Sequence, residues 1–264
     1  MKIIVCVKQV PATNEVRMDP VTNTIIREGV ESILNPFDAF AMEEALRLRE
    51  RHGGCEIITI SMGIPSVRGI LQETIALGAD QAFLLSDRAF AGADTLATAH
   101  ALAAGINKLG AADLYICGKM ATDGDTAQVG PMLAEMLGVA HATDIAEIEQ
   151  VSDSELLCRK LTDDGYVRIR VQLPAVITVS KEINVPRLPS ISGVLRGLAA
   201  DIPVFTADDV AVDKAQIGLS GSPTQVIKTF VPDLTQHIEW IEGKPAEQAA
   251  ELLEKLVARR AIIR

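Results

Sequence analysis

Hydrophobic and polar positions alternate in regular blocks over the first 140 or so residues of the chain. Short apolar runs have the length of buried strands: residues 3–7, 56–60, 81–85 and 113–117. Segments of helical period lie between and after them: residues 38–51, 66–77, 94–109 and 132–137. Strands that alternate with helices are typical of a mostly parallel sheet covered on both faces. The pattern therefore predicts an α/β core of Rossmann-like type.

The pattern changes after residue 143, where short strands follow one another with only turns between them. The expected strands are residues 145–151, 155–161, 167–173 and 175–179. Turn sequences at residues 152–154 and 163–165 separate them. This part predicts an antiparallel meander that is added to the parallel sheet.

The last third of the chain looks like an arm. Regular structure is expected to end at residues 184–189, and residues 190–233 are loop-rich, with Pro203, Pro223 and Pro232. A helix is predicted from Pro245 to about residue 262. Its apolar stripe consists of Ala249, Leu252, Leu253, Leu256 and Val257. That stripe suits docking on the chain's own domain or on a partner.

A turn at residues 118–131 is the strongest candidate for a binding site. Gly118 ends a strand, small residues follow, and helical sequence resumes at Met132, so backbone N–H groups near a helix start are available to an anion. Asp125 and Gln128 fit a capping box, and Asp123 is left to accept from a sugar hydroxyl. Because Pro131 cannot donate an intrahelical hydrogen bond, we expect the helix to begin near residue 130 and the backbone of 123–129 to be exposed. The alternative is an ordinary capped turn.

Other turns at strand ends support a nucleotide cleft. Parallel sheets bind ligands outside the carboxyl ends of their strands. Residues 6–10, 61–63 and 86–88 follow strands, as residues 118–131 do. Residues 35–38, NPFD, precede a helix that Asp38 is predicted to cap.

Composition narrows the class of protein. The 264 residues carry a formal net charge of −10, which argues against nucleic acid as a partner. No apolar window is long enough for a membrane span and no signal peptide is visible, so we expect a cytoplasmic protein. The cysteines Cys6, Cys55, Cys117 and Cys158 form no C-x-x-C pair and are expected to be buried thiols. Neither a metal site nor a hydrolase motif is predicted.

Several segments in order resemble the beta (small) subunit of electron-transferring flavoproteins over essentially the whole chain. They are residues 5–11 (VCVKQVP), 35–38 (NPFD), 41–45 (AMEEA), 118–125 (GKMATDGD), 171–179 (VQLPAVITV) and 184–187 (NVPR). The resemblance implies a sheet of the adenine-nucleotide alpha-hydrolase type with an extended C-terminal arm. It also implies residues 1–190 as the nucleotide-binding domain, and residues 191–264 as a recognition loop, arm and helix that pack on an alpha subunit.

Within that family the chain is most similar to NADH-oxidising, electron-bifurcating members. The similar segments are residues 27–30, 86–98, 123–131 and 221–228. The resemblance implies FAD in this subunit, where ordinary members hold AMP. NADH would be the electron donor, and ferredoxin or flavodoxin one acceptor. An acyl-CoA dehydrogenase or related flavoenzyme would be the other acceptor, reached through the FAD of the alpha subunit.

The same resemblance implies which residues contact the nucleotide. They are Cys6, Asn35, Pro36, Phe37, Asp38, Met62, Gly118, Lys119, Met120, Ala121, Thr122, Asp123, Gly124, Asp125, Thr126, Ala127, Gln128 and Val129, with Asp94 and Thr95 at a helix start opposite. Ile191 stands where the family has the apolar anchor of its recognition loop for the dehydrogenase. Ordinary members have a lysine-rich run there, whereas residues 194–200 here read VLRGLAA, which suits a partner of different surface charge.

Two other hypotheses follow from the same residues. One is a plain electron carrier of this family with structural AMP. The other is a nucleotide-binding module without redox work, similar to the adenine-nucleotide stress-protein folds. That module would be stable alone, as a monomer or homodimer.

Overall fold

The computed structural model describes residues 1–12, 31–227 and 238–261 and divides into two compact units, Met1–Ile227 and Lys228–Arg264. The segment 27–30, Pro232 and residue 262 lie outside the described residues. Among the described helices, none is at once long and apolar enough to span a membrane. The first unit contains the sheet and the candidate site.

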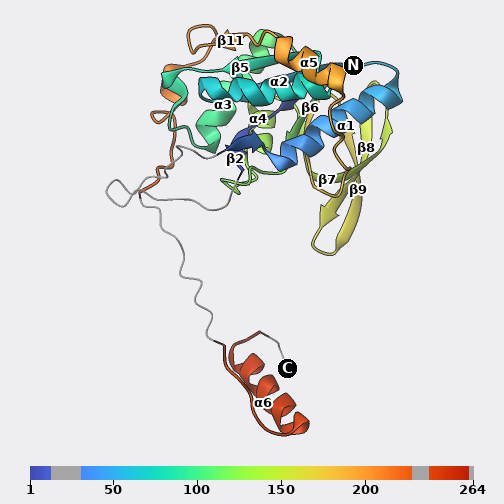
Figure 1. The fold of residues 1–264 in the computed structure, drawn as a ribbon, viewed down its shortest axis with the longest axis vertical. Helices are drawn as coiled ribbons and strands as arrows, with labels where there is room; N and C mark the ends of the chain where they lie inside the picture. Colours follow the sequence, from blue (N-terminus) through green and yellow to red (C-terminus); the bar gives the residue numbers. More distant parts are fainter. Residues whose placement is uncertain (13–30, 228–237, 262–264) are drawn as a thin grey trace. The chain divides into compact units, whose positions relative to one another are not determined.

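A single large sheet organises the first unit (Figure 1), and in its described part the strand order is β11-β5-β4-β1-β6-β10-β7-β8-β9. The parallel strands are β1 (Lys2–Cys6), β4 (Glu56–Met62), β5 (Gln81–Leu85), β6 (Leu114–Gly118), β10 (Ala175–Val179) and β11 (Val204–Phe205). The remaining strands are β7 (Ala140–Val151), β8 (Glu155–Thr162) and β9 (Gly165–Gln172). A separate antiparallel pair consists of β2 (Gln9–Pro11) and β3 (Ser32–Leu34).

Helices cover both faces of the sheet. They are α1 (Pro36–His52), α2 (Arg68–Leu77), α3 (Thr95–Leu109), α4 (Val129–Leu137) and α5 (Ile191–Ala199), with short 3₁₀ turns η1 (Pro65–Val67), η2 (Arg88–Phe90) and η3 (Lys214–Gln216). Ile3 and Val5 of β1 pack in one core with α1 and α2, while Ile4 and Cys6 pack in a second core with α3 and α4. Successive side chains along a strand point to opposite faces of the sheet, so one strand contributes to both cores. The predicted α/β fold is confirmed.

One strand of the expected meander belongs elsewhere. β7, β8 and β9 are antiparallel neighbours, as predicted. The prediction that residues 175–179 continue the meander is wrong, because β10 runs parallel to both β6 and β7 and lies between them. All five of its residues are buried, as expected for a central strand with both faces covered.

The prediction of a loop directly after residue 189 is also wrong, because α5 forms there. Ser190 caps it by accepting from the N–H of Gly193 at 3.0 Å. Glycine is needed for its close approach to α2: a Cβ would lie 2.3 Å from Ala76 O at Gly193 and 2.4 Å from Gln72 O at Gly197. The two glycines of α5 therefore serve close helix packing.

The second unit contains the predicted C-terminal helix, α6 (Pro245–Ala258), which ends a few residues earlier than expected. The segment before it folds back along it, since Gln248 Nε2 donates to Ile241 O at 2.9 Å and Lys255 pairs with Glu239. Leu252 and Leu253 of the apolar stripe stay nearly half exposed. Within the second unit, the stripe is therefore not fully covered.

Candidate nucleotide-binding site

The carboxyl end of β6 meets the N-terminal turn of α1. Gly118 packs so closely there that a Cβ would lie 2.4 Å from Asp38 Oδ1 and 2.7 Å from the backbone carbon of Phe37. Cys6, the last residue of β1, is the register partner of Cys117 next to Gly118. The structure thus brings together the predicted residues of three separate segments at one edge of the sheet.

Asp38 joins these segments from inside. It does not cap α1 as predicted, because Asn35 is the N-cap residue and Asp38 lies within the helix. Its buried carboxylate accepts from the N–H of Lys8 at 2.7 Å and from the N–H of Gly118 at 3.2 Å. Burial raises the pKa of Asp38 to about 7, although these hydrogen bonds and the nearby Lys8 charge act in the opposite direction.

Asn35 fixes the start of the candidate loop. Its side chain is 1% exposed, its Nδ2 donates to Met120 O at 2.9 Å, and its Oδ1 accepts from the N–H of Thr122 at 3.2 Å. The side-chain amide of Asn35 thus binds a residue 85 positions away in sequence, and it makes no hydrogen bond that caps its own helix. Asn35 therefore helps to fix the conformation of residues 120–122.

The backbone of residues 123–128 is exposed and in part left-handed. Asp125 has φ of 49° and Ala127 has φ of 54°, conformations that cost non-glycine residues about 1–3 kcal/mol each. The N–H groups of Gly124 and Asp125 both donate hydrogen bonds to Ala121 O. Those of Thr126, Ala127 and Gln128 have no acceptor within the described part of the chain. Left-handed residues within such a turn form concave surfaces of N–H groups that suit an anion.

The predicted capping box at this turn is wrong. Helix α4 begins at Val129, Gln128 is its N-cap residue without a side-chain cap bond, and Asp125 takes the left-handed conformation instead. Gln128 Oε1 accepts from Thr95 Oγ1 at 3.0 Å, which ties the turn to the start of α3. The expected helix start near residue 130 and the exposed backbone before it are confirmed.

Charged side chains surround the turn. Asp123 is paired with Lys8 at 2.6 Å. The sequence had suggested a free Asp123, and the ion pair differs from that expectation. Lys119 pairs with Asp144 at 2.7 Å, and that carboxylate raises the pKa of Lys119. Lys8 lies in the strand-end segment 6–10 but was not among the predicted site residues. Its placement adds a cation beside the exposed amides.

The start of α3, with the predicted candidates Asp94 and Thr95, is tied to Ser222 and Thr224, which were not among the predicted site residues. Asp94 caps α3, with its Oδ1 accepting from the N–H groups of Leu96 and Ala97. Its Oδ2 accepts from Thr224 N at 3.0 Å and Thr224 Oγ1 at 2.8 Å, and its own N–H donates to Ser222 Oγ. The segment 221–228 was noted only for its resemblance, and its Ser-Pro-Thr sequence was the available signal.

The other predicted residues are placed as follows. Phe37 and Met62 are half-buried, Pro36 is exposed, and Cys6 is buried. The neighbouring Cys6 thiol, together with burial, raises the pKa of Cys117, and all four cysteines are free and buried as predicted. Among the described residues, no cluster of His, Cys, Asp or Glu could hold a metal ion. The arrangement suits recognition of an anionic nucleotide by N–H groups and Lys8.

A mostly parallel sheet with helices on both faces, and at its carboxyl edge a loop whose amides have no acceptor among the described residues, defines an α/β protein of Rossmann-like type. Residues 22–210 match the model of the electron transfer flavoprotein domain. The electron transfer flavoprotein subunit beta of Thermoanaerobacterium thermosaccharolyticum is 48% identical over 263 residues, covering 99% of this chain and 100% of that one. The chain therefore belongs to the electron transfer flavoprotein family, as a beta subunit with a role in electron transfer.

Other relatives have different names. The caffeyl-CoA reductase-Etf complex subunit CarD of Acetobacterium woodii is 44% identical over 263 residues, covering 99% of this chain and 100% of the relative. Protein FixA of Azorhizobium caulinodans is 41% identical over 258 residues, covering 94% of this chain and 92% of the relative. The resemblance drawn from the sequence is thus confirmed at the level of the family.

Proposed function

We propose that this beta subunit binds FAD at residues 118–129 and takes part in electron bifurcation from NADH. One electron of each pair goes to ferredoxin or flavodoxin, and the other goes through the FAD of an alpha subunit to an acyl-CoA dehydrogenase. The observation that carries the proposal is the exposed loop with left-handed Asp125 and Ala127, whose N–H groups suit a diphosphate. The segments similar to bifurcating members support it.

In this proposal the chain holds the nucleotide through backbone N–H groups, one nearby cation and two supporting side chains. The N–H groups of Thr126–Gln128 and the start of α4 bind phosphate oxygens, with Lys8 as the nearby cation. Asn35 and Asp38 keep the loop in shape from below. Bound there, FAD would supply the redox chemistry that no side chain of the site offers. This division of work fits a site without an acid–base pair or a nucleophile.

Cofactor extraction from the purified heterodimer tests the choice of ligand. Two FAD per heterodimer support the proposal, whereas one FAD with one AMP would make the protein a plain electron carrier. NADH-dependent reduction of ferredoxin should then require the second acceptor to be present, as bifurcation demands. Expression of the chain alone tests the remaining alternative, because a stable monomer or homodimer that binds ATP or AMP would favour a non-redox module.

The exposed face of α5 is the proposed contact for the dehydrogenase. Ile191 is 85% exposed, and Leu195 and Leu198 follow it at helical spacing, also exposed. Apolar side chains that remain in water on an otherwise packed helix mark an interaction surface. The change Ile191→Asp should raise the KM for the dehydrogenase at least tenfold. Ser192→Asp is the matched control, since it adds the same charge one position away from the stripe.

Residues 191–264 are proposed to serve the contacts of the complex, and α6 is proposed to pack on the alpha subunit. The half-exposed Leu252 and Leu253 support this. Leu253→Asp should reduce recovery of the alpha subunit with a tagged beta chain. Glu254→Asp, a change on the same helix beside the stripe, should not. Equal recovery with both variants would argue against this role of α6.

A further inference from the structure

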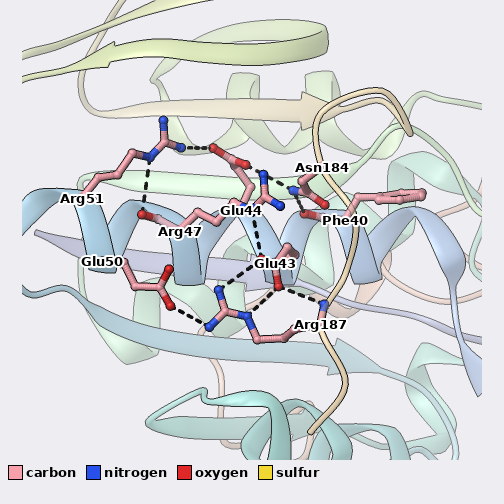
Figure 2. Close-up of polar contacts among 8 residues, drawn as sticks. All are labelled: Phe40, Glu43, Glu44, Arg47, Glu50, Arg51, Asn184 and Arg187. Atoms are coloured by element: carbon pink, nitrogen blue, oxygen red, sulfur yellow. Dashed lines mark hydrogen bonds and ion pairs between the residues drawn. The ribbon is translucent and has the colours of Figure 1, made fainter.

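A network of charged and amide side chains holds the segment between β10 and α5 against helix α1 (Figure 2). Arg187 makes a two-pronged contact with Glu43, with Nε donating to Oε2 at 2.8 Å and Nη2 donating to Oε1 at 3.1 Å. Its backbone N–H donates to Glu43 Oε2 at 3.1 Å, and its Nη1 donates to Glu50 Oε1 at 2.6 Å. Such paired geometry is specific to arginine, since lysine has no fork of donors.

Asn184 adds a second attachment three residues earlier. Its Nδ2 donates to Phe40 O at 3.0 Å and to Glu44 Oε2 at 3.1 Å. Glu44 is buried, burial raises its pKa, and Arg51 pairs with its other oxygen. We call these contacts of Asn184 and Arg187 with α1 the clamp.

The clamp fixes the backbone of residues 184–188, which also carries exposed apolar side chains. Val185 and Leu188, on either side of Arg187, are 78% and 90% exposed, and Ile191 begins α5 directly afterwards. An exposed apolar segment without regular structure gains no burial of its own, so polar attachments must order it. Asn184 and Arg187 reach α1, whereas Val185 and Leu188 stay exposed.

We propose that Arg187 is a positioning residue, which with Asn184 holds Val185 and Leu188 in line with α5 as one preformed apolar surface for the flavoenzyme partner. The inference rests on the proposed docking role of α5. A segment that is ordered beforehand loses less conformational entropy on binding, so the clamp increases affinity without touching the partner. Helix α5 has its own attachment to α2 through Gly193, Gly197 and Arg196, whose Nη2 donates to Ile75 O. Loss of the clamp should thus loosen residues 185–190 and leave α5 folded.

The variants Arg187→Gln and Arg187→Lys test this in the complete heterodimer. Arg47→Gln is the matched control, because Arg47 also pairs with Glu43, through Nε at 2.9 Å, but among the described residues it makes no hydrogen bond or ion pair with residues 184–190. The probe is a purified, oxidised short-chain acyl-CoA dehydrogenase supplied with crotonyl-CoA, which accepts electrons from NADH through the heterodimer with ferredoxin present. A small dye that NADH reduces through the same heterodimer serves as an acceptor that needs no docking surface. Hydrogen exchange of the free heterodimer reports the order of residues 185–190 without any partner.

We expect Arg187→Gln to raise the KM for the dehydrogenase about tenfold with kcat and dye reduction unchanged. Amide exchange in residues 185–190 should become at least tenfold faster, while exchange in residues 118–129 and the nucleotide content stay as they were. Arg187→Lys should recover part of both effects, and Arg47→Gln should show neither. Unchanged exchange in Arg187→Gln would overturn the proposal, and so would faster exchange with an unchanged KM.

The docking role of α5 can fail separately. If Ile191→Asp leaves the KM unchanged, α5 is not the contact and the proposed function is wrong on that point. If Ile191→Asp raises the KM but Arg187→Gln does not, α5 is the contact and only the positioning role of Arg187 is wrong.

Discussion

Helix α1 holds two loops, one at its first turn and one along its middle, and it holds them by different chemistry. At the first turn, Asn35 and Asp38 bind backbone groups of residues 118–122 and Lys8, and Gly118 packs directly on the helix. Along the middle, Glu43 and Glu44 bind the side chains of Arg187 and Asn184. The first attachment leaves N–H groups exposed and the second leaves apolar side chains exposed.

This difference matches what each loop is proposed to bind. N–H groups suit a small anionic ligand, whereas exposed apolar side chains suit a protein surface. One carboxyl from each attachment, Asp38 and Glu43, responds to pH with opposite sign. Burial raises the pKa of Asp38 to about 7, so its carboxyl stabilises the fold less as pH rises. Burial also opposes ionisation of Glu43, but its hydrogen bonds with Arg187 and Arg47 prevail and lower its pKa, so its contribution is lost as pH falls.

The largest expected effect is at the first turn, in Gly118→Ala. A Cβ there would overlap Asp38 Oδ1 and Phe37, and overpacking of this kind costs about 1–3 kcal/mol. We expect the dissociation constants for FAD and AMP, measured by calorimetry, to rise at least tenfold. Gly124→Ala is the matched control in the same loop, because its Cβ would meet no atom within 4 Å. Equal losses in the two variants would show that close packing on α1 does not shape the loop.

A pair of asparagine variants separates the two attachments next. Asn35→Ala leaves Met120 O and the N–H of Thr122 without their side-chain partner, and loss of such partly buried hydrogen bonds costs about 0.5–1.5 kcal/mol each. Nucleotide affinity should therefore fall roughly tenfold. Asn184→Ala, which removes contacts of the same kind from the clamp, should leave nucleotide affinity unchanged. If Asn184→Ala also released nucleotide, the two loops would not be independent.

The pH dependence gives an effect whose sign is fixed by the pKa of Asp38. The pKa of Asp38 is near 3.8 when unfolded and about 7 in the fold, so the folded state binds more protons between these values. Stability from this group is therefore fully present below about pH 4 and is lost as pH rises toward 7. The thermal midpoint of the wild-type heterodimer should fall relative to that of Asp38→Asn between pH 5 and pH 8. Parallel profiles for the two proteins would contradict the raised pKa.

The smallest expected effect is at the exposed pair of Lys8 and Asp123. Such pairs contribute up to about 1 kcal/mol, so Asp123→Asn should change FAD affinity by less than about fivefold. A much larger loss would mean that Asp123 contacts the ligand directly, as its carboxylate beside a nucleotide first suggested.

The sequence predicted well wherever local pattern decides structure. The apolar runs placed β1, β4, β5 and β6 within two residues, because a buried parallel strand needs a continuous apolar run. Periodicity alone does not predict, however, which strands lie next to one another in the sheet. The run that became β10 was therefore assigned to the meander that precedes it in sequence.

A candidate site could be proposed from its turn residues, but the geometry of these residues could not be predicted. The bond from Asn35 to Met120 joins residues 85 positions apart, and no local pattern reports it. Asp125 fitted a capping box in sequence, yet it adopts φ of 49°, which moves the helix start away from it. Helix α5 was not predicted from the sequence. Glycine has a low helix propensity, and the close packing of Gly193 and Gly197 against α2 is visible only in the fold.

The position of β10 has a consequence for how the protein forms. This strand pairs with β6, but the chain makes β7, β8 and β9 between the two. The N–H of Lys119 donates to Val179 O, and a Cβ at Gly130 would lie 2.4 Å from Thr178 Cγ2, so β10 supports both sides of the 118–129 turn. During synthesis this turn thus lacks its support until about residue 180 has emerged. Pairings between distant segments form slowly, so we infer that the cofactor enters after the meander is complete.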